Sequence, residues 1–571
     1  MPDATYDVVI AGGGCKALYL AMYLTRYAGM SVGVFERRHE LGGGLATEET
    51  AAPGFRGNTH ANLALWSYWL PLYRDFPEFW EYGAKVDQYP VSGGASFLNN
   101  ETCVAIYSEK VDPTQEKSAA EIARFSGKDA ETWLKLSAAV SGDAIQKMML
   151  DLFFIPADKR MSPEVLMHQA EAFAVLAAAG VEIDGLILQA SGVRATREFF
   201  ESKEMQYLIT RGYVSAAIDP SDATTAIFLP FILAYANNLF LVRGGTHQVA
   251  HAAHQILVHD GCKFHTHAEV TKVLIENGTA TGVRLADGSE IKARKLVITA
   301  GLSAGQVVDI VGRDVFGEKI SRRVDLLSTR NIGCLMWYTF ALNEAPSYIT
   351  EAINPDMHAC FWHMLASKAD PEHAINECRY AKMGKLPPLE DYNPTVWCHS
   401  LIDPSYAPPG KHVAQTEMQG PPAAMYTERE WIEIKKKHME DLVTYWSQFA
   451  PNMTWDNIIG VDSNSPYDCL RMKNLEPDGN FAGIDMSPCQ RFELRPIPEL
   501  AAHRTPVKNL YCTGGHWPMG VNMGSDSSYT CYKVIAEDHD LAKPWEEPGK
   551  EEPDSLLEER KKLFERVRDE F

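Results

Sequence analysis

The sequence has no surplus of basic residues. Its 571 residues include 54 Lys and Arg against 75 Asp and Glu, which gives a formal net charge of −21. Nucleic acids bind to basic faces because their phosphate charges must be neutralised, so this balance argues against a nucleic-acid partner. It also disfavours purely electrostatic docking on anionic lipid, although a local apolar patch would still allow peripheral contact with a membrane.

Long apolar runs, a basic leader and paired cysteines are also missing. No run of about 18 apolar residues occurs, which argues against a spanning helix. The first residues, MPDATYDVVIAGGG, show neither a basic n-region nor a cleavage site. The eleven cysteines lie apart without a CxxC pair, so we expect reduced thiols rather than disulfides or a zinc site. These absences predict a cytoplasmic protein without a metal centre.

The first 36 residues alternate between strand and helix patterns. Residues 6–10 are a short apolar run that enters glycines, residues 17–27 have apolar side chains at helical spacing, and residues 31–36 form a second apolar run. This order predicts a βαβ unit and places the chain in the α/β class. At this length two or more domains are expected.

A glycine fingerprint joins the first strand to the helix. Gly12, Gly14 and Ala17 match the pattern GxGxxA. The first glycine permits a tight turn, the second lets a pyrophosphate approach the backbone, and the small third residue lets helix and strand pack closely. Glu36 ends the second strand, where an acid binds ribose hydroxyls, and the helix start offers N–H groups to phosphates. The sequence therefore predicts a dinucleotide site.

The residues after Glu36 indicate which dinucleotide binds. Arg37 would suit the 2′-phosphate of NADP. Residues 40–47, ELGGGLAT, instead look like the second glycine motif of FAD-binding oxidoreductases, with Gly43 and Gly44 as its paired glycines. On this motif the chain resembles the phytoene desaturase-like flavoproteins, within the amine oxidase-type FAD fold. The resemblance implies FAD as the cofactor.

Three further segments extend the resemblance over nearly the whole chain. Residues 243–245 and 268–273 look like the family's return to the FAD domain, where the backbone of Val270 would contact the adenine. Residues 403–412 are similar to a segment typical of this branch, and residues 495–520 resemble the C-terminal flavin-contacting signature. Fingerprint and resemblance together assign cofactor binding to Gly12, Gly14, Cys15, Lys16, Ala17, Glu36, Arg37, Gly43, Gly44, Leu45, Thr59, Val270, Gly514, Gly520, Val521, Asn522 and Met523. Within the loop we expect Lys16 to point to solvent and Cys15 to be a small packing residue.

The C-terminal signature departs from the family pattern in two places. Residues 515–523, GHWPMGVNM, stand where the family often has a proline and glycine run, and residues 525–529, SDSSY, replace the expected small residues. Flavin binding tolerates such changes, because backbone N–H groups at a helix start make most of the contacts. Carotenoid specificity does not follow, so the substrate stays open beyond its apolar character.

No catalytic triad is legible in the sequence, and the metalloprotease motif HExxH is absent. Hydride transfer needs neither, because the flavin supplies the redox chemistry. His60 lies where the chain passes the isoalloxazine ring in related folds, and His516 and Trp517 lie in the C-terminal flavin segment. These three are the candidate catalytic residues. For each histidine, hydrogen bonding to backbone or flavin is the alternative to acid–base catalysis.

Two other patterns each allow two interpretations. Eight aromatic residues lie between residues 66 and 82, and they either line a substrate tunnel or membrane-facing entrance, or pack in the core. After Pro553 the charged tail, residues 543–571, has its apolar residues on one stripe of a helix. This helix either docks on its own chain or forms an interface between subunits.

The motifs together predict a discontinuous Rossmann-like FAD-binding domain of the glutathione reductase type, joined to an α+β substrate domain. The first comprises residues 1–97, 240–320 and 465–542, and the second residues 98–239 and 321–464. The expected function is FAD-dependent dehydrogenation, or desaturation, of a small apolar, isoprenoid-like substrate by hydride transfer to the flavin.

Two other functions stay open. One is a redox-neutral isomerase or hydratase of an apolar alkene, and the other is a flavin-bearing subunit of a hetero-oligomeric complex. A homo-oligomer is also open as the assembly of the chain. No second nucleotide motif is visible, so the electron acceptor is not identified.

Overall fold

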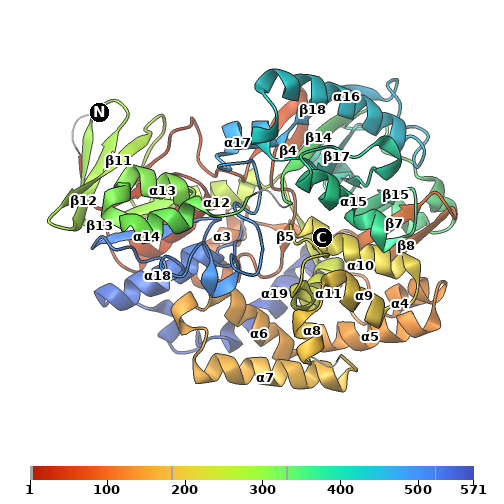
Figure 1. The fold of residues 1–571 in the computed structure, drawn as a ribbon, viewed down its shortest axis with the longest axis horizontal. Coiled ribbons are helices and arrows are strands. Elements are labelled where there is room, and N and C mark those ends of the chain that lie inside the picture. The colour runs from red at the N-terminus through yellow and green to blue at the C-terminus, as the bar shows by residue number, and fades with distance from the viewer. Residues whose placement is uncertain (1–3, 182–183, 330–331, 521–522) are drawn as a thin grey trace.

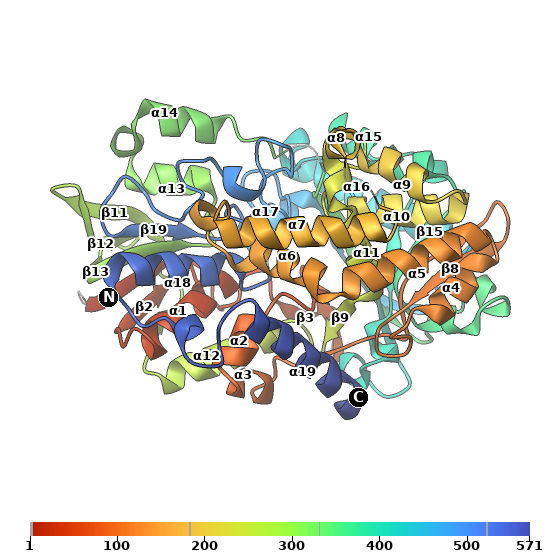
Figure 2. The same ribbon diagram turned by 90° about the horizontal axis from the view of Figure 1, so that it is seen from below.

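Two seven-stranded sheets organise the molecule (Figure 1). The structure is a computed structural model that describes residues 4–181, 184–329, 332–520 and 523–571. The first sheet has helices on both faces, and the second has a long helix on one face and a helical layer on the other (Figures 1 and 2). This is the expected combination of a Rossmann-like α/β domain with an α+β domain.

The first sheet is built around β1 (Ala4–Ala11), which pairs in parallel with β2 (Val32–Phe35) and β13 (Glu290–Ala300). Its order is β10-β2-β1-β13-β12-β11, with β19 also pairing with β13. The remaining strands are β10 (Lys263–His265), β11 (Val270–Glu276), β12 (Thr279–Leu285) and β19 (Leu510–Thr513). The predicted parallel strands at the start of the chain are confirmed.

Alternate side chains of β1 enter two different cores. Val8 and Ile10 pack with α1 (Cys15–Arg26), α12 (His247–His259) and α18 (Asp526–His539). Val9 packs with α13 (Ala304–Val311) and α14 (Arg313–Asp325) on the other face. Figure 2 shows these two helical groups on opposite sides of the strands. Burial on both faces is what a short, uninterrupted apolar strand requires.

The second sheet has the order β18-β14-β17-β16-β15-β7-β8. Tyr338 and Phe340 of β14 face a core formed with α16 (Glu428–Trp446), whereas Leu335 and Trp337 face the helices α10 (Lys203–Ser215) and α11 (Leu229–Asn237). The strands are β7 (Val91–Phe97), β8 (Thr102–Tyr107), β14 (Leu335–Leu342), β15 (Cys360–Ala366), β16 (Thr395–Trp397), β17 (His412–Gln419) and β18 (Ile458–Asn464).

Strand β7 corrects one predicted domain limit. It forms a hairpin with β8 and a parallel pair with β15, so it belongs to the second sheet. The predicted boundary between residues 97 and 98 cuts this hairpin and is wrong, because the glycines of VSGGASF hide the strand pattern. We place the junction before Val91, and the other domain limits stay predictions.

A helical layer lies between β8 and α11 along the chain. Its main helices are α4 (Glu116–Ala123), α5 (Gly127–Ser141), α6 (Asp143–Phe154), α7 (Pro163–Ala178), α8 (Gly185–Gln189) and α9 (Gly192–Phe199). Across the described ranges, no helix combines the length and the apolar character that crossing a membrane requires.

The tail forms α19 (Asp554–Glu570), which packs against α2 (Leu70–Asp75) and α6. Leu556, Leu563 and Val567 on its apolar stripe are buried. Arg560 forms an ion pair with Glu109 at 3.2 Å. Docking on the same chain is therefore confirmed. The alternative, an interface between subunits through this stripe, is wrong, because the chain itself covers the stripe.

Candidate functional site

A cavity of about 570 Å³ is lined by turns that follow strands of the first sheet, by strands of the second sheet and by the helical layer. One part of its wall is glycine-rich backbone, and the other part is made of apolar side chains. The backbone part includes Gly14, Gly43, Gly44, Gly301, Gly515 and Gly520, and the apolar part includes Met148, Met149, Phe153, Leu176, Phe228, Phe231, Tyr235, Trp337, Trp362, Phe481 and Met486.

The two predicted glycine motifs lie against each other. Cys15 N–H donates to the Gly42 carbonyl at 3.3 Å, and Gly42 N–H donates to the Gly13 carbonyl at 2.9 Å. Gly12 has a φ of +99°, and a Cβ there would lie 2.0 Å from the Ala300 oxygen, so only glycine fits. At Gly14, by contrast, the nearest described atom to an added Cβ would be 4.0 Å away. The Gly14 backbone therefore faces open space at the start of α1.

Glu36 stabilises the first glycine turn through hydrogen bonds to its side chain. Its carboxylate accepts hydrogen bonds from Gly13 N–H at 2.7 Å and from Arg38 N–H at 2.8 Å. Ala268 N–H donates to the Glu36 carbonyl at 2.8 Å, which brings the segment before Val270 to the same edge of the sheet. Among the described residues, Gly12, Ala17, Glu36, Arg37, Thr59, Val270 and Gly514 lie outside the cavity wall, whereas Cys15, Lys16, Leu45 and Met523 belong to it.

Lys16 does not point to solvent, so that prediction is wrong. Its side chain is buried, donates to the Gly524 carbonyl at 2.6 Å and forms an ion pair with Asp526. Asp526 also accepts a hydrogen bond from Met519 N–H at 2.8 Å. The pair is possible because α18 covers the start of α1. Cys15 is buried, and burial raises the pKa of its thiol to about 11, which confirms it as a packing residue.

Both candidate histidines line the cavity. Burial and, to a smaller extent, the Lys473 charge lower the pKa of His60 to about 4. Burial also lowers the pKa of His516 to about 3, with a smaller effect of Arg495. His516 Nδ1 accepts a hydrogen bond from Ala304 N–H at 3.3 Å. Both imidazoles are therefore neutral near pH 7.

Trp517 corrects another expectation. Its side chain is fully buried among the residues around α13, and its Nε1 donates to the Leu500 carbonyl at 3.0 Å. Within the described part of the chain, Trp517 is not among the residues of the cavity wall. It packs in the core around α13, whereas His516 belongs to the cavity wall.

The C-terminal signature is shaped by its first residue, Arg495, which the sequence analysis did not single out as a site residue. Arg495 is fully buried and donates to the carbonyls of Gly515 at 2.8 Å and Ile484 at 3.2 Å. A Cβ at Gly520 would lie 2.6 Å from the Arg495 side chain, so the loop lies directly on the guanidinium. Val521 and Asn522, also predicted to bind the cofactor, lie outside the described residues.

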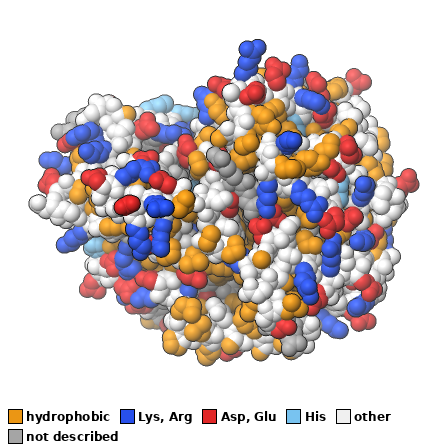
Figure 3. Space-filling view, viewed as in Figure 1, with side chains coloured by type: hydrophobic (Ala, Val, Ile, Leu, Met, Phe, Trp, Pro, Cys, Tyr) orange, Lys and Arg blue, Asp and Glu red, His pale blue; other side chains and the backbone are white. Residues whose placement is uncertain are grey.

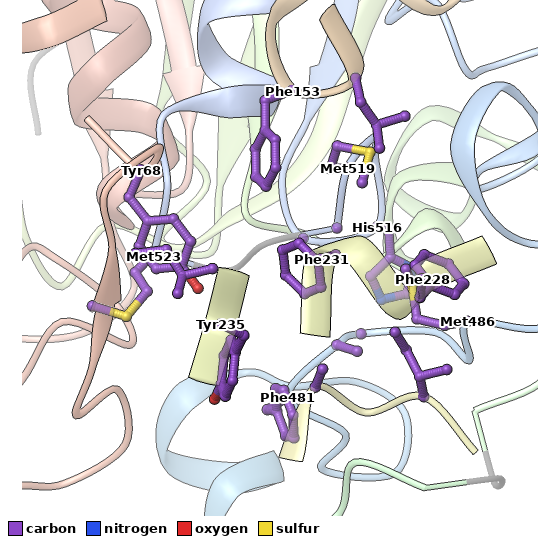
Figure 4. A pocket seen from close by; sticks show the side chains of 18 of the residues that line it. Tyr68, Phe153, Phe228, Phe231, Tyr235, Phe481, Met486, His516, Met519 and Met523 are labelled. Carbon is purple, nitrogen blue, oxygen red and sulfur yellow. The ribbon is translucent and has the colours of Figure 1, made fainter. Parts of the chain in front are cut away.

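The apolar wall comes mainly from the helical layer. Figure 4 shows Phe153 of α6, Phe231 and Tyr235 of α11, and Met486 around one shared space. The sequence patterns did not single out these residues, although the methionines and phenylalanines of α6 are a visible signal. Of the aromatic cluster at residues 66–82, Tyr68 lines the cavity and the others of the described chain do not. All but Tyr82 are buried, so the cluster is mainly core.

The residues present fit a dinucleotide with a polar heterocycle, as FAD has. His60 Nε2 and Lys473 Nζ belong to residues of the cavity wall and are buried polar atoms without a hydrogen-bond partner among the described residues. Such atoms normally have partners, so a ligand with polar edges would satisfy them. The open backbone at Gly14 and the start of α1 would receive the phosphates. The described residues contain no cluster of His, Cys, Asp and Glu that could hold a metal ion.

Comparison with known proteins gives a consistent result. A family model described as "FAD dependent oxidoreductase" matches residues 7–330. One of the subunits of limonene dehydrogenase from Castellaniella defragrans is 25% identical, covering 95% of this chain and 96% of that protein. Hydroxyneurosporene desaturase of Cereibacter sphaeroides is 22% identical, covering 93% and 97%. A solved putrescine oxidase variant has a TM-score of 0.56 at 14% identity, covering 94% and 99% of the two chains, and shows the shared fold.

Proposed function

The chain belongs to the FAD dependent oxidoreductase family, and we propose that it dehydrogenates a small apolar, isoprenoid-like alkene by hydride transfer to the flavin. The observation that carries the proposal is the continuous cavity, whose glycine-rich part adjoins a wall of methionine and aromatic side chains. An apolar substrate gains free energy from leaving water in such a wall. The relatives named for limonene and hydroxyneurosporene support the same substrate class.

FAD, when bound, would supply the hydride acceptor. We assign its phosphates to the Gly14 turn and its polar ring edges to the region of Thr59 and His60. The chain's own contribution is to exclude water and to orient the C–H bond through shape. His60 and His516 are neutral at working pH, so neither histidine is the imidazolium acid that could protonate an alkene in a hydration.

The proposal is tested by anaerobic single turnover of the purified, FAD-loaded protein with limonene, geraniol and farnesene as probes. We expect the oxidised flavin band to bleach with at least one probe, in proportion to the dehydrogenated product. A redox-neutral isomerase or hydratase gives product while the band stays oxidised. Product without bleaching, and without an added acceptor, would overturn the dehydrogenase proposal.

We further propose that the protein works in the cytoplasm and meets membrane-dissolved substrate at the mouth of the cavity. Met161, Phe173 and Leu188 both line the cavity and are exposed, and Leu166 and Met167 on α7 are exposed beside them. Figure 3 shows apolar side chains gathered on the lower part of the face in view, where α6 and α7 lie in Figure 1. Cosedimentation with zwitterionic vesicles tests this, and no binding would contradict it.

Assembly with a second, different chain is the remaining part of the proposal. It is supported by the relative whose name makes it one subunit of a limonene dehydrogenase, and which matches this chain over nearly its whole length. The contact between the two chains cannot use the apolar stripe of α19, because this stripe is buried within the chain. Light scattering of the fully active protein measures the mass, and a monomeric mass with full turnover would contradict the proposal.

A further inference from the structure

An ionisable side chain interrupts the apolar wall of the cavity. Glu417 lies on β17, belongs to the cavity wall and is 6% exposed. It pairs across the sheet with Trp337 of β14, which also lines the cavity, so both side chains leave the same face of the sheet. A carboxyl group in this position has lost most of its hydration without joining the polar, glycine-rich part of the site.

The positive charge near Glu417 belongs to Arg211, which also interacts with a second acidic residue. Arg211 of α10 lies 3.2 Å from Glu377 of α15 (Pro371–Lys382), and both are buried. Arg211 also donates to Thr395 Oγ1 at 3.2 Å and to the Asn393 carbonyl at 3.1 Å. One guanidinium therefore faces two carboxyl groups, and its direct ion pair is with Glu377. No described residue makes a hydrogen bond to the Glu417 carboxyl.

This arrangement favours a protonated Glu417. Burial raises the pKa of Glu417 to about 8, the Arg211 charge opposes that rise, and the Glu377 charge adds to it. Tyr235, the other titratable group facing it, has a pKa raised far above neutral and is uncharged. Near pH 7 the carboxyl group is therefore mostly a neutral O–H donor that points at the cavity.

Ser215 provides a second polar atom at the same place. It lines the cavity, and its hydroxyl oxygen accepts hydrogen bonds from Trp362 Nε1 at 2.9 Å and from Arg211 at 3.3 Å. With its oxygen occupied in this way, its own O–H is free to donate. Two donors thus meet within an otherwise apolar wall.

We propose that Glu417 is a specificity residue that donates its proton in a hydrogen bond to an oxygen atom of the substrate, so that the preferred substrates are isoprenoid-like alkenes carrying one hydroxyl or carbonyl group. A buried donor without a partner is unfavourable, and a ligand oxygen would satisfy it. A site built in this way rejects the analogue that lacks the oxygen. The proposal rests on the proposed function, because it concerns the substrate of the same cavity.

The test compares two probes that differ by one oxygen atom: geraniol and the hydrocarbon in which its hydroxymethyl group is a methyl group. Their affinities for the oxidised, FAD-loaded protein are measured by anaerobic titration of the flavin spectrum and by calorimetry. We expect geraniol to bind at least about tenfold more tightly, the factor that corresponds to one restored hydrogen bond. Glu417→Leu should remove this preference, whereas Glu417→Gln, which keeps a neutral donor, should retain it.

A neighbouring variant controls for changes in the strand. Thr416 is the next residue on β17, is buried and points to the other face. Thr416→Val should leave both affinities unchanged. Affinity for geraniol should also fall above a pH of about 8 in the wild-type protein and stay constant in Glu417→Gln, because only the glutamic acid loses its proton.

Equal affinity for the two probes in the wild-type protein, including no binding of either, would overturn the proposal. Loss of FAD from Glu417→Gln would also overturn it, since the residue would then serve the cofactor. If geraniol is preferred but the flavin never bleaches, the dehydrogenase function fails and the recognition role stands. If both probes bleach the flavin and bind equally well, the recognition role fails and the dehydrogenase function stands.

Discussion

The Lys16 ammonium group and the Asp526 carboxylate form a buried ion pair between the starts of α1 and α18. The two residues are 510 positions apart, and their side chains are 4% and 1% exposed. Lys16 follows the phosphate-loop glycines, and Asp526 accepts a hydrogen bond from Met519 N–H in the C-terminal signature. The pair therefore joins the segment assigned to the phosphates of the cofactor to the segment assigned to its flavin.

Replacing Lys16 by Met should lower the free energy of unfolding by about 3–5 kcal/mol, because it leaves the Asp526 charge buried without a counter-ion. Adding Asp526→Asn should recover much of this loss, since the amide oxygen still accepts from Met519 N–H and the unpaired charge is gone. Urea denaturation and the FAD-to-protein ratio measure both effects.

The control for this variant is an exposed ion pair. Lys117 and Asp356 lie 2.7 Å apart with side chains 51% and 44% exposed, so Lys117→Met should cost less than about 1 kcal/mol. A Lys16→Met protein as stable as the wild type would show that the buried pair contributes nothing beyond its desolvation cost.

Gly14→Val should abolish FAD binding while the protein stays folded. Gly14 has a φ of −67° and a ψ of 170°, which valine adopts easily, and the added Cβ meets no described atom closer than 4.0 Å. The side chain would instead occupy the space assigned to the pyrophosphate. Absorbance of the flavin band measures FAD binding, and circular dichroism measures whether the protein is folded.

Gly127 is the matched control, because it begins α5 and an added Cβ meets no described atom within 4 Å. Gly127→Val should keep full FAD occupancy. If Gly14→Val also remains yellow, the phosphate-loop assignment is wrong.

Local patterns were enough to predict the opening elements to within two residues. The predicted strand at residues 6–10, helix at residues 17–27 and strand at residues 31–36 correspond to Ala4–Ala11, Cys15–Arg26 and Val32–Phe35. Each is a mainly apolar segment next to glycine or polar residues, so short-range preferences and tertiary burial agree.

The parts that could not be predicted depend on contacts between distant segments. The glycine turns of the cavity follow from backbone geometry and are legible in the sequence. The Asp526 partner of Lys16 lies 510 residues away, and the shared charge at Glu417 requires residues from α10 and α15. Residue types alone do not show which acid faces which base, because that pairing follows from the packing of the layers.

Leu563→Ala should destabilise the protein without changing its FAD content or its molar mass. Leu563 lies on α19 and is 1% exposed, so its truncation should cost about 2–5 kcal/mol in lost burial and a cavity. Leu326→Ala, at a residue 72% exposed, should change the free energy of unfolding by no more than about 0.5 kcal/mol. A lower mass for Leu563→Ala in light scattering would instead place α19 at a subunit interface.

Variants of His516 distinguish a chemical role of this residue from a hydrogen-bonding role. Its Nδ1 accepts from the buried Ala304 N–H at the start of α13. Burial lowers its pKa to about 3, so the imidazole stays neutral in the folded protein over the working range. His516→Ala leaves the Ala304 N–H unpaired and should cost about 1–3 kcal/mol, whereas the side-chain oxygen of His516→Asn can accept in its place.

The sign of the pH dependence follows from the same lowered pKa. In the unfolded chain His516 takes up a proton near pH 6.5, but in the folded protein it does so only near pH 3. Its contribution to stability is therefore complete above pH 6.5 and is lost as the pH falls toward 3, by about 1.4 kcal/mol per pH unit. The free energy of unfolding of His516→Asn should fall less steeply than that of the wild type over this window.

Single-turnover bleaching should keep its wild-type rate in His516→Asn, because a neutral hydrogen-bond acceptor is all that position supplies. Loss of bleaching in both His516→Ala and His516→Asn, with FAD retained, would instead make His516 a participant in the chemistry.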